Sequence, residues 1–337
     1  MLTICEYENK LEAQWDDFVI NKSINGTFLQ TRRFLNYHPE GRFIDRSLVF
    51  YNKGNTIVAV IPACELFDEH KKTFFSHKGS TYGGIIIGRD FYNIKHVGSI
   101  IFDLEAYLVE QGFTKVIIKN TADIFCKDET KLLEYFLFKE NYQSYDELSF
   151  YIDFNLYKDD IISNLSASKR RDYKYSLKNN LAIRELLSKT ELESFYNILE
   201  INLCKFAKTP VHSLAELIDM KVKRLGDIAC FYGVYMEKEM IAGSMVFNFD
   251  NEVFHTQYLA SNPEYLSCYP MDFLIVNLIK YAYDKNFKYM SFGISTENNG
   301  KFLNEGLARF KEGFGCKYAI NKTFYKDINT LNSYSYY

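Results

Sequence analysis

The sequence predicts an α+β fold made of two similar halves, and three observations support this prediction. Two pairs of neighbouring β-rich runs are each joined by a short turn sequence, which indicates two antiparallel hairpins. Each hairpin is followed along the chain by a further strand, an amphipathic helix and another strand. A mostly helical segment separates the two groups. This order predicts, in each half, a mixed and largely antiparallel sheet that is flanked by helices.

In the first half, a hairpin is expected at residues 47–51 and 57–66, because both runs are rich in β-branched and aromatic residues. The sequence Asn52-Lys53-Gly54-Asn55 between them is typical of a turn. A glycine-marked strand over 82–88, a helix over 96–110 and a strand over 116–118 are expected next.

The second hairpin is expected at residues 230–235 and 241–249. Between the hairpins, Ser188 and Ser213 each precede a glutamate by three residues, which is the capping-box pattern of a helix start. Helices over 169–178, 191–205, 214–224 and 271–284 and strands over 252–259 and 289–292 complete the expected elements.

The two halves match element for element, and an internal duplication is the simplest explanation. The length of 337 residues also exceeds the usual size of a single domain. We therefore expect two domains, residues 1–155 and 156–337, with the boundary near residue 155.

Composition and charge exclude several functional classes. Hydrophobic residues make up 47% and charged residues 25% of the chain, which is ordinary for a folded protein. A net charge of −3 gives no long-range attraction for nucleic acids, so any such contact must be local. The seven cysteines stand singly and the six histidines show no metal-ligand spacing, which predicts free thiols and no metal site. The sequence contains no nucleophile elbow, P-loop or dinucleotide-binding glycine pattern.

The first residues lack the basic and apolar regions of a signal peptide. The most apolar long segment, residues 271–283, contains Asp272, Asn277 and Lys280 and is too short and too polar to cross a bilayer. We expect no transmembrane segment and a cytoplasmic location.

The segment 292–315 contains the pattern Gly306-Leu307-x-x-Phe310-Lys311-x-x-Phe314-Gly315. Two further motifs precede it, Phe28-Leu29-Gln30-Thr31 and Lys169-Arg170-Arg171. In these motifs and their order, the sequence resembles the Fem-like acyltransferases, a branch of the GNAT superfamily that includes peptidoglycan aminoacyltransferases. The resemblance implies two tandem GNAT-like domains, transfer of an acyl or aminoacyl group to an amine, and an acceptor site between the halves.

Amide formation from an ester or thioester needs a group that accepts a proton and a group that stabilises the oxyanion. Lys311 lies four residues after Leu307 and borders an apolar helix stripe, so its ammonium is a candidate for electrostatic catalysis. Spacing alone favours a lysine that reaches solvent, whereas the resemblance favours the catalytic role. For proton transfer, the candidates are Glu297, in a polar run after a strand, and His255, on a polar strand face. A surface turn and a structural histidine are the alternatives.

Two groups of residues are candidates for binding the substrates. Arg170, Arg171 and Lys174 form a basic helix stripe that suits a phosphate, although a solvated helix face explains them equally well. Lys78, Tyr82 and Gly83, in a stretch rich in glycines and hydroxyls, are the candidates for the acceptor site, and a β-bulge is the alternative.

Asp272, at the start of a helix, suits a substrate amine or simply the helix dipole. The remaining candidates for substrate binding lie near His255 and Lys311 in the sequence, and they are Gln257, Tyr258, Ser295 and Asn304.

Together with these residues, the resemblance implies an N-acyltransferase that forms an amide on an amino sugar or peptide amine. The acceptor would belong to a nucleotide- or lipid-linked cell-envelope precursor, of peptidoglycan, capsule or lipopolysaccharide. Acyl-CoA or an acyl-carrier protein is the favoured donor, and no tightly bound cofactor is expected. Enzymes of the GNAT superfamily that use CoA hold its pyrophosphate in a Q/R-x-x-G-x-G/A loop, but the corresponding stretch 261–267 has no glycine. One alternative is a tRNA-dependent aminoacyltransferase of the peptidoglycan stem peptide, with aminoacyl-tRNA as donor. The other is a non-catalytic protein that binds an envelope precursor.

Overall fold

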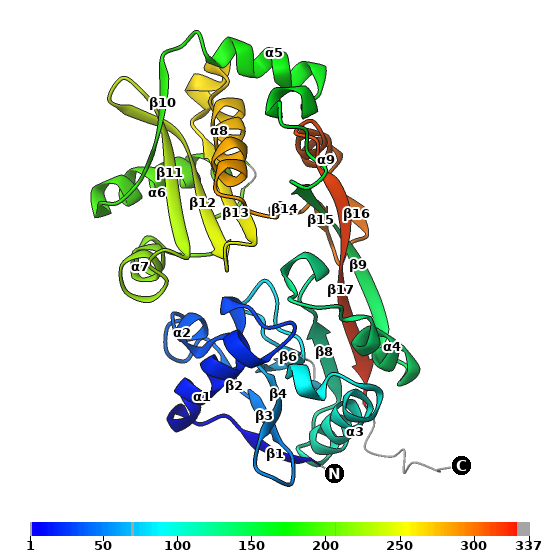
Figure 1. Ribbon diagram of the computed structural model, residues 1–337. Coiled ribbons are helices and arrows are strands. Elements are labelled where there is room, and N and C mark those ends of the chain that lie inside the picture. The colour runs from blue at the N-terminus through cyan, green and yellow to red at the C-terminus, as the bar shows by residue number, and fades with distance from the viewer. Residues whose placement is uncertain (1, 69–70, 206, 329–337) are drawn as a thin grey trace. The chain divides into compact units, whose positions relative to one another are not determined.

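The computed structural model describes residues 2–68, 71–205 and 207–328 (Figure 1). The described residues form two compact units: unit 1 contains residues 2–68, 71–146 and 321–328, and unit 2 contains residues 147–205 and 207–320. The chain therefore passes from unit 1 to unit 2 after residue 146, shortly before residue 155, and returns to unit 1 after residue 320. The boundary of two tandem domains near residue 155 stays a prediction.

Unit 2 is built on one mixed sheet. Its neighbouring strands are antiparallel except for β13 and β14, which run parallel. In spatial order the strands are β10 (Leu181–Glu185), β11 (Ala229–Met236), β12 (Glu239–Phe249), β13 (Val253–Ser261), β14 (Tyr289–Ile294) and β9 (Gln143–Asp153).

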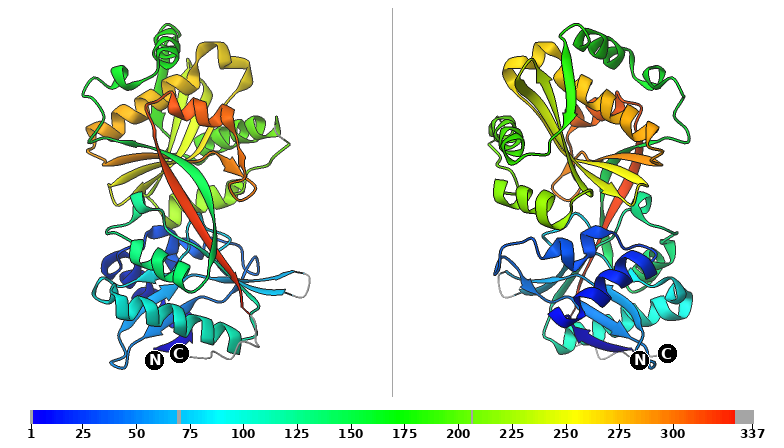
Figure 2. Two further views of the ribbon diagram at one scale, coloured as in Figure 1. Left: turned by 90° about the vertical axis from the view of Figure 1, so that its right-hand side faces the viewer. Right: turned by 60° about the vertical axis from the view of Figure 1, so that its left-hand side comes forward.

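Two long helices of unit 2, α6 (Lys189–Cys204) and α8 (Pro270–Asp284), cover opposite faces of this sheet (Figures 1 and 2). Successive residues of a strand point to opposite faces. The Cβ position of Gly243 in β12 lies 2.6 Å from the ring of Phe195 in α6, whereas the adjacent Ala242 belongs to the core cluster that contains α8. The other elements of unit 2 are α5 (Ala167–Ser176), α7 (Leu214–Asp219), α9 (Glu305–Glu312) and a small hairpin of β15 (Thr296–Glu297) and β16 (Phe302–Leu303).

Unit 1 repeats the strand pattern of unit 2. Its main sheet contains, in order, β17 (Lys317–Asp327), β8 (Lys115–Lys119), β6 (Lys71–Ser76), β5 (Cys64–Asp68) and β2 (Ile44–Asp45), and only β6 and β8 run parallel. A second antiparallel sheet consists of β1 (Thr3–Glu6), β3 (Leu48–Tyr51), β4 (Ile57–Ile61) and β7 (Ile86–Ile87). The helices are α1 (Glu12–Asp17), α2 (Arg32–Leu35), α3 (Ile94–Glu110) and α4 (Lys131–Lys139).

The structure confirms the predicted α+β class, with mixed, mostly antiparallel sheets flanked by helices. The helices expected over 96–110, 191–205 and 271–284 correspond to α3, α6 and α8. Both capping boxes are present at the starts of α6 and α7. The helix expected over 214–224 is α7 followed by a π-helical turn, Met220–Arg224.

Two strand predictions in the first half were wrong. The run 57–66 is two strands in different sheets, because Pro62 has no N–H and β4 ends at Ile61 before β5 begins at Cys64. The run 82–88 contains only the short strand β7. The counterpart of β13 in unit 1 is β6, since each pairs in parallel with the strand that follows the long helix.

Each half of the sequence supplies its last strand to the other unit. Strand β9 contributes Phe150 and Ile152 to the core of unit 2. Strand β17 contributes Phe324 to the core of unit 1, where Ile328 follows it. In unit 2, the pairs β12–β13, β13–β14 and β14–β9 are antiparallel, parallel and antiparallel. The pairs β5–β6, β6–β8 and β8–β17 of unit 1 have the same three directions in the same order.

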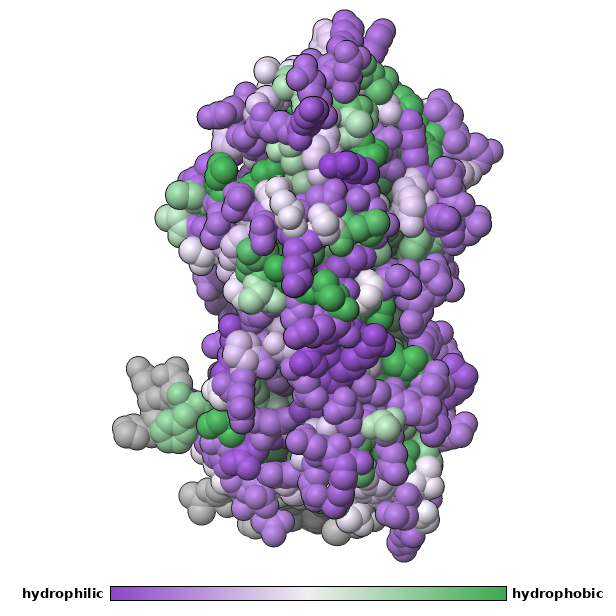
Figure 3. Space-filling model, turned by 90° about the vertical axis from the view of Figure 1, so that its left-hand side faces the viewer, coloured by the Kyte–Doolittle hydropathy of each residue, from purple (hydrophilic) through white to green (hydrophobic). Residues whose placement is uncertain are grey.

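Hydrophilic residues cover most of the face of the molecule seen in Figure 3. This distribution agrees with elements whose apolar faces point into the two cores. Over the described ranges, none of the helices has the length and apolarity needed to cross a membrane.

Candidate active site

The parallel pair β13 and β14 separates in the middle of unit 2. Their pairing covers Val253–His255 against Tyr289–Ser291 and then stops. Strand β13 continues to Ser261 paired only with β12 among the described strands. Strand β14 turns at Gly293, which has a φ of 65° and lies at a bulge against β9. The two strands therefore leave an open edge of β13 beside the end of β14.

Lys311 lies at this opening and is buried, with 3% of its surface exposed. Its ammonium donates hydrogen bonds to the carbonyl oxygens of Gly293 and Ile294, at 3.0 and 2.7 Å. Burial lowers the pKa of Lys311 to about 8. The buried face of α9 differs from the apolar stripe expected from the sequence. Leu307 is exposed, and Ala308 and Lys311 are the buried residues of the helix.

His255 lies in the same group of residues. Its Nδ1 is 3.0 Å from the hydroxyl of Ser291, and that hydroxyl oxygen accepts the N–H of Gly293 at 3.3 Å. Which of the two groups donates in the contact between Nδ1 and this hydroxyl depends on the tautomer of the ring. Burial, and next to it the charge of Lys311, lowers the pKa of His255 to about 4. A histidine with this pKa is neutral at pH 7 and accepts a proton poorly.

Sequence reasoning did not select Ser291 as a site residue. Ser291 is 1% exposed and is the polar residue in an otherwise apolar strand core, Met290-Ser291-Phe292. A buried hydroxyl in such a run needs a hydrogen-bond partner, and this was the signal that could have identified it.

Two of the predicted substrate-binding residues, Ser295 and Asn304, are linked to the segment that Lys311 contacts. Ser295 follows the carbonyl of Ile294, is 2% exposed, and its hydroxyl has no hydrogen-bond partner among the described residues. Asn304 caps α9, since its side chain accepts the N–H of Leu307 at 3.1 Å, and its own N–H donates to the carbonyl of Ser295 at 2.9 Å. Ser295 therefore has an unused polar group on the residue that follows Ile294, whose carbonyl Lys311 contacts.

Glu297 lies outside this buried group. It is exposed in β15, and its carboxylate forms an ion pair with Lys208 at 3.1 Å. Its role as a general base stays a prediction.

Along β13, Gln257 is half-buried, and the hydroxyl of Tyr258 lies 2.6 Å from Nδ1 of His212. Burial raises the pKa of Tyr258 to about 12.

Asp272 is paired within the protein. Its carboxylate lies 2.7 Å from the ammonium of Lys169, and both side chains are nearly buried. That ammonium also lies 4.2 Å from the ring centre of Phe310. Burial raises the pKa of Asp272 in spite of this partner. An internal lysine thus occupies the position predicted for a substrate amine.

The rest of the basic stripe on α5 is exposed. Arg170 bonds to the carbonyl of Leu165 at 2.7 Å, and Arg171 pairs with the neighbouring Asp172 at 3.0 Å. Lys174 is exposed on the same helix. Their role in binding phosphate stays a prediction.

The segment between β13 and α8 is a poor cradle for a pyrophosphate. Such a cradle needs free backbone N–H groups at the start of a helix. Here Pro263 and Pro270 have no N–H, and a short 3-10 helix spans Pro263–Cys268. The N–H groups of Glu264 and Tyr265 already donate to Asn262. The segment thus lacks the glycine motif in its sequence and has few free backbone N–H groups in its structure.

In unit 1, the corresponding end of the parallel pair is closed by the chain itself. The N–H of Gly83 donates to the carbonyl of Lys119 at 3.0 Å, and the N–H of Gly84 donates to the hydroxyl of Ser76 at 3.0 Å. The Cβ position of Gly83 lies only 1.7 Å from the carbonyl oxygen of Ser76. Gly83 thus permits a close backbone approach within the protein, so no ligand is needed to explain it.

The other two acceptor candidates differ in exposure. Tyr82 is 2% exposed and packs against Phe125, with ring centres 5.2 Å apart. Lys78 is exposed, and its N–H lies 3.5 Å from the sulfur of Cys64. A role in binding the acceptor stays a prediction for both residues.

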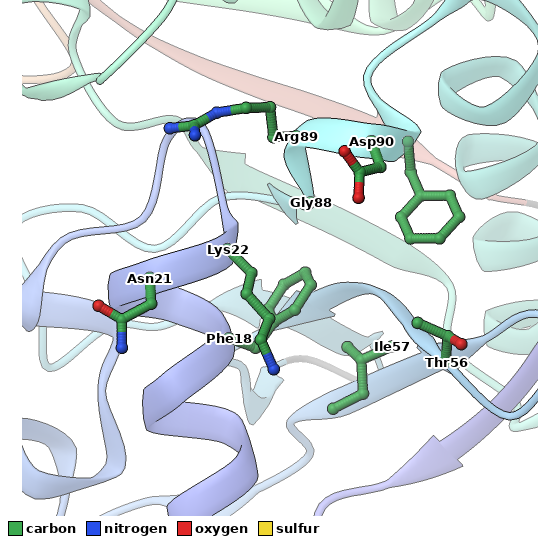
Figure 4. Close-up of a pocket in the computed structure, with 9 residues that line it drawn as sticks. Phe18, Asn21, Lys22, Thr56, Ile57, Gly88, Arg89 and Asp90 are labelled. Atoms are coloured by element: carbon green, nitrogen blue, oxygen red, sulfur yellow. The ribbon is translucent and has the colours of Figure 1, made fainter.

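A surface pocket of about 240 Å³ also lies in unit 1, between the π-helical turn Phe18–Lys22, β4 and the residues after β7 (Figure 4). Its charged lining residues are exposed, and Lys22 is paired with Asp17 at 2.6 Å. The side chain of Arg89 points away from Phe18 and Ile57. The lining brings together no buried titratable group, so we place the candidate site in unit 2.

The comparisons with known proteins support this reading of the fold. No protein-family model and no curated protein matches the sequence. The structure is similar to that of FemX, with a TM-score of 0.69 and 11% identity over 96% of each chain. It is also similar to a tandem GNAT protein from the clavulanic acid biosynthesis pathway, with a TM-score of 0.58 and 8% identity over 98% of this chain and 99% of that one. The chain has the tandem GNAT fold.

The structure is also similar to that of L-PGS from Bacillus licheniformis, with a TM-score of 0.60 and 12% identity over 97% of this chain and 94% of that one. In the terms of the GNAT fold, β13 and β14 are the parallel strands that separate, and the group of His255, Ser291, Gly293 and Lys311 lies where they do so. Among the described residues, no cluster of His, Cys, Asp and Glu side chains could hold a metal ion.

Proposed function

We propose that the protein is an amide-forming acyltransferase or aminoacyltransferase and that unit 2 carries the reaction. The observation that carries this proposal is the buried ammonium of Lys311 at the opening between β13 and β14. An amine group that is held in place and shielded from water is able to exchange a proton with the reacting groups and, once protonated, to stabilise an oxyanion.

For the acceptor, we propose a primary amine on an amino sugar or peptide of a cell-envelope precursor. This part rests on the resemblance of the segment 292–315 to Fem-like acyltransferases and on the fold shared with FemX. The hydroxyl of Ser295, which has no hydrogen-bond partner among the described residues, is the group we assign to a polar atom of the substrates.

For the donor, two observations favour aminoacyl-tRNA over the CoA thioester favoured by the sequence alone. The start of α8 offers few free N–H groups for a pyrophosphate. On α5, Tyr175 stacks on Tyr269 with ring centres 5.8 Å apart and an angle of 28° between the planes. Arg171 and Lys174 are exposed on the same helix. Aromatic rings flanked by cations are the pattern that binds single-stranded nucleic acid.

The test is a product screen. The purified protein is incubated with an envelope-precursor extract and, separately, with pools of acyl-CoA, acyl-carrier-protein thioesters and aminoacyl-tRNA, and new amides are identified by mass spectrometry. Transfer from aminoacyl-tRNA is the expected result, and Lys311→Ala should lose it. Transfer from a thioester alone would overturn the donor assignment. Binding of a precursor without any amide product would identify a binding protein instead of an enzyme.

A further inference from the structure

The surroundings of Lys311 are unusual for a charged lysine. No carboxylate among the described residues forms an ion pair with it, although the structure buries its side chain. Lys169, which is also nearly buried, shows the usual arrangement, because its ammonium is 2.7 Å from the carboxylate of Asp272. Burying a charge without a partner is costly, and a lysine in this position shifts toward its neutral form.

The groups that face Lys311 from the surrounding elements do not supply a negative charge. His255 on β13 is neutral, because burial lowers its pKa to about 4. From β9, the ring of Phe150 lies 5.4 Å from the ammonium. Cys316, after α9, stays a neutral thiol because burial raises its pKa. The adjacent Glu312 is exposed and accepts the hydroxyl of Tyr318 at 2.7 Å.

The two carbonyl contacts suit a neutral amine. A neutral primary amine has two N–H groups and one lone pair, whereas an ammonium has three N–H groups. The carbonyl oxygens of Gly293 and Ile294 accept two N–H groups, at 3.0 and 2.7 Å. In the neutral form, both N–H groups are then used in these hydrogen bonds, and the lone pair is left to accept a proton. Because both carbonyls belong to consecutive residues at the bulge of β14, they fix the direction of that lone pair.

From this geometry we propose that Lys311 is the proton acceptor of the transfer reaction, acting from its neutral amine form. This inference rests on the proposed function. The nitrogen of the acceptor amine attacks the carbonyl carbon of the donor, and a C–N bond forms. The nitrogen loses one proton to Nζ of Lys311. The bond between the acyl carbon and the oxygen or sulfur of its carrier then breaks, and the carrier leaves with the proton that Lys311 returns. The products are one amide and one protonated carrier.

The substitution Lys311→Arg distinguishes a proton acceptor from a purely electrostatic catalyst, because arginine keeps the positive charge but does not lose its proton in proteins. Initial rates are measured from pH 6 to pH 9.5 with the aminoacyl-tRNA pool and the precursor extract, for the wild-type protein, Lys311→Arg and Lys311→Ala. The wild-type rate should rise with pH through a pKa of about 8. Both variants should lose about 10²- to 10⁴-fold in kcat. The matched control is Arg309→Ala, an exposed cation on the same helix, which should behave like the wild type.

Three results would overturn the proposal. One is a Lys311→Arg variant that keeps a tenth or more of the wild-type kcat. Another is a wild-type rate that does not change between pH 7 and pH 9. The third concerns labelling by acetic anhydride, which reacts only with a neutral amine: the proposal fails if the labelling of Lys311 depends on pH in the same way as that of an ordinary lysine. This measurement needs neither turnover nor a substitution. If the wild-type protein forms no amide with any donor, the proposed function fails, and the inference fails with it.

Discussion

At the scale of single residues, burial determines the protonation of two histidines, one in each unit. The pKa of His77 and the pKa of His255 are both lowered to about 4, with burial as the largest cause. The N–H of Gly79 donates to Nδ1 of His77 at 3.1 Å, and Ser291 lies 3.0 Å from Nδ1 of His255. In His77, Nδ1 therefore acts as an acceptor.

These two histidines predict a loss of stability in mild acid. The unfolded chain binds protons on its histidines near pH 6.5, whereas the folded chain binds them on His77 and His255 only near pH 4. The free energy of unfolding should therefore fall as the pH is lowered from about 6.5 to about 4, by up to about 1.4 kcal/mol per pH unit for each histidine. Urea unfolding at pH 7, 6 and 5 measures this slope. His77→Gln or His255→Gln should make the slope smaller, and an unchanged slope in both variants would contradict the assignment.

Gly83 predicts a large effect of a single methyl group. In Gly83→Ala the new Cβ would overlap the backbone of Ser76, which cannot move without breaking the end of β6. We expect a loss of about 3 kcal/mol or more in the free energy of unfolding, measured by chemical denaturation. Gly54→Ala is the control in the same unit, because its nearest neighbour is the side chain of Asn52 at 3.3 Å, and it should change stability by about 0.5 kcal/mol or less. Equal effects of the two substitutions would contradict this account.

At the scale of elements, the ion pair of Lys169 and Asp272 joins α5 to the first turn of α8. In Lys169→Met, the carboxylate of Asp272 would stay buried without its partner, and we expect a loss of about 3 kcal/mol in stability. The double variant Lys169→Met with Asp272→Leu should recover most of this loss, because no buried charge remains. Thermal and urea unfolding of the three proteins compare them. A double variant no more stable than Lys169→Met would show that packing, and not charge, explains the effect.

The elements that could be predicted from the sequence carry local signals. The helices α3, α6 and α8 have amphipathic patterns, and capping boxes mark the starts of α6 and α7. Strands β9 and β17 were not predicted, because each mixes polar and aromatic residues without a turn signal, and their partners are distant in the sequence. In the same way, sequence reasoning selected Lys311 and His255, while the contact between His255 and Ser291 depends on the parallel register of β13 and β14.

At the scale of the whole molecule, the exchange of β9 and β17 predicts that the two halves of the sequence do not fold separately. A fragment of residues 1–155 lacks Phe324 and Ile328 from the core of unit 1 and leaves an edge of β8 unpaired. A fragment of residues 156–337 lacks Phe150 and Ile152 from the core of unit 2. We expect both fragments to show little cooperative unfolding by circular dichroism and to gain structure when mixed. Two fragments that each unfold cooperatively alone would contradict this expectation.

The position of β17 in the sequence also sets the order of events during synthesis. Domains usually fold as the ribosome releases them, with the N-terminal domain first. Unit 1 differs, because β17, which pairs with the edge of β8 that β6 leaves open, is translated after nearly all of unit 2. Unit 2 has received β9 before its own strands emerge and can close as soon as β14 is released. The unit translated first is therefore the unit completed last, and until then the open edge of β8 is a surface that a chaperone would have to protect.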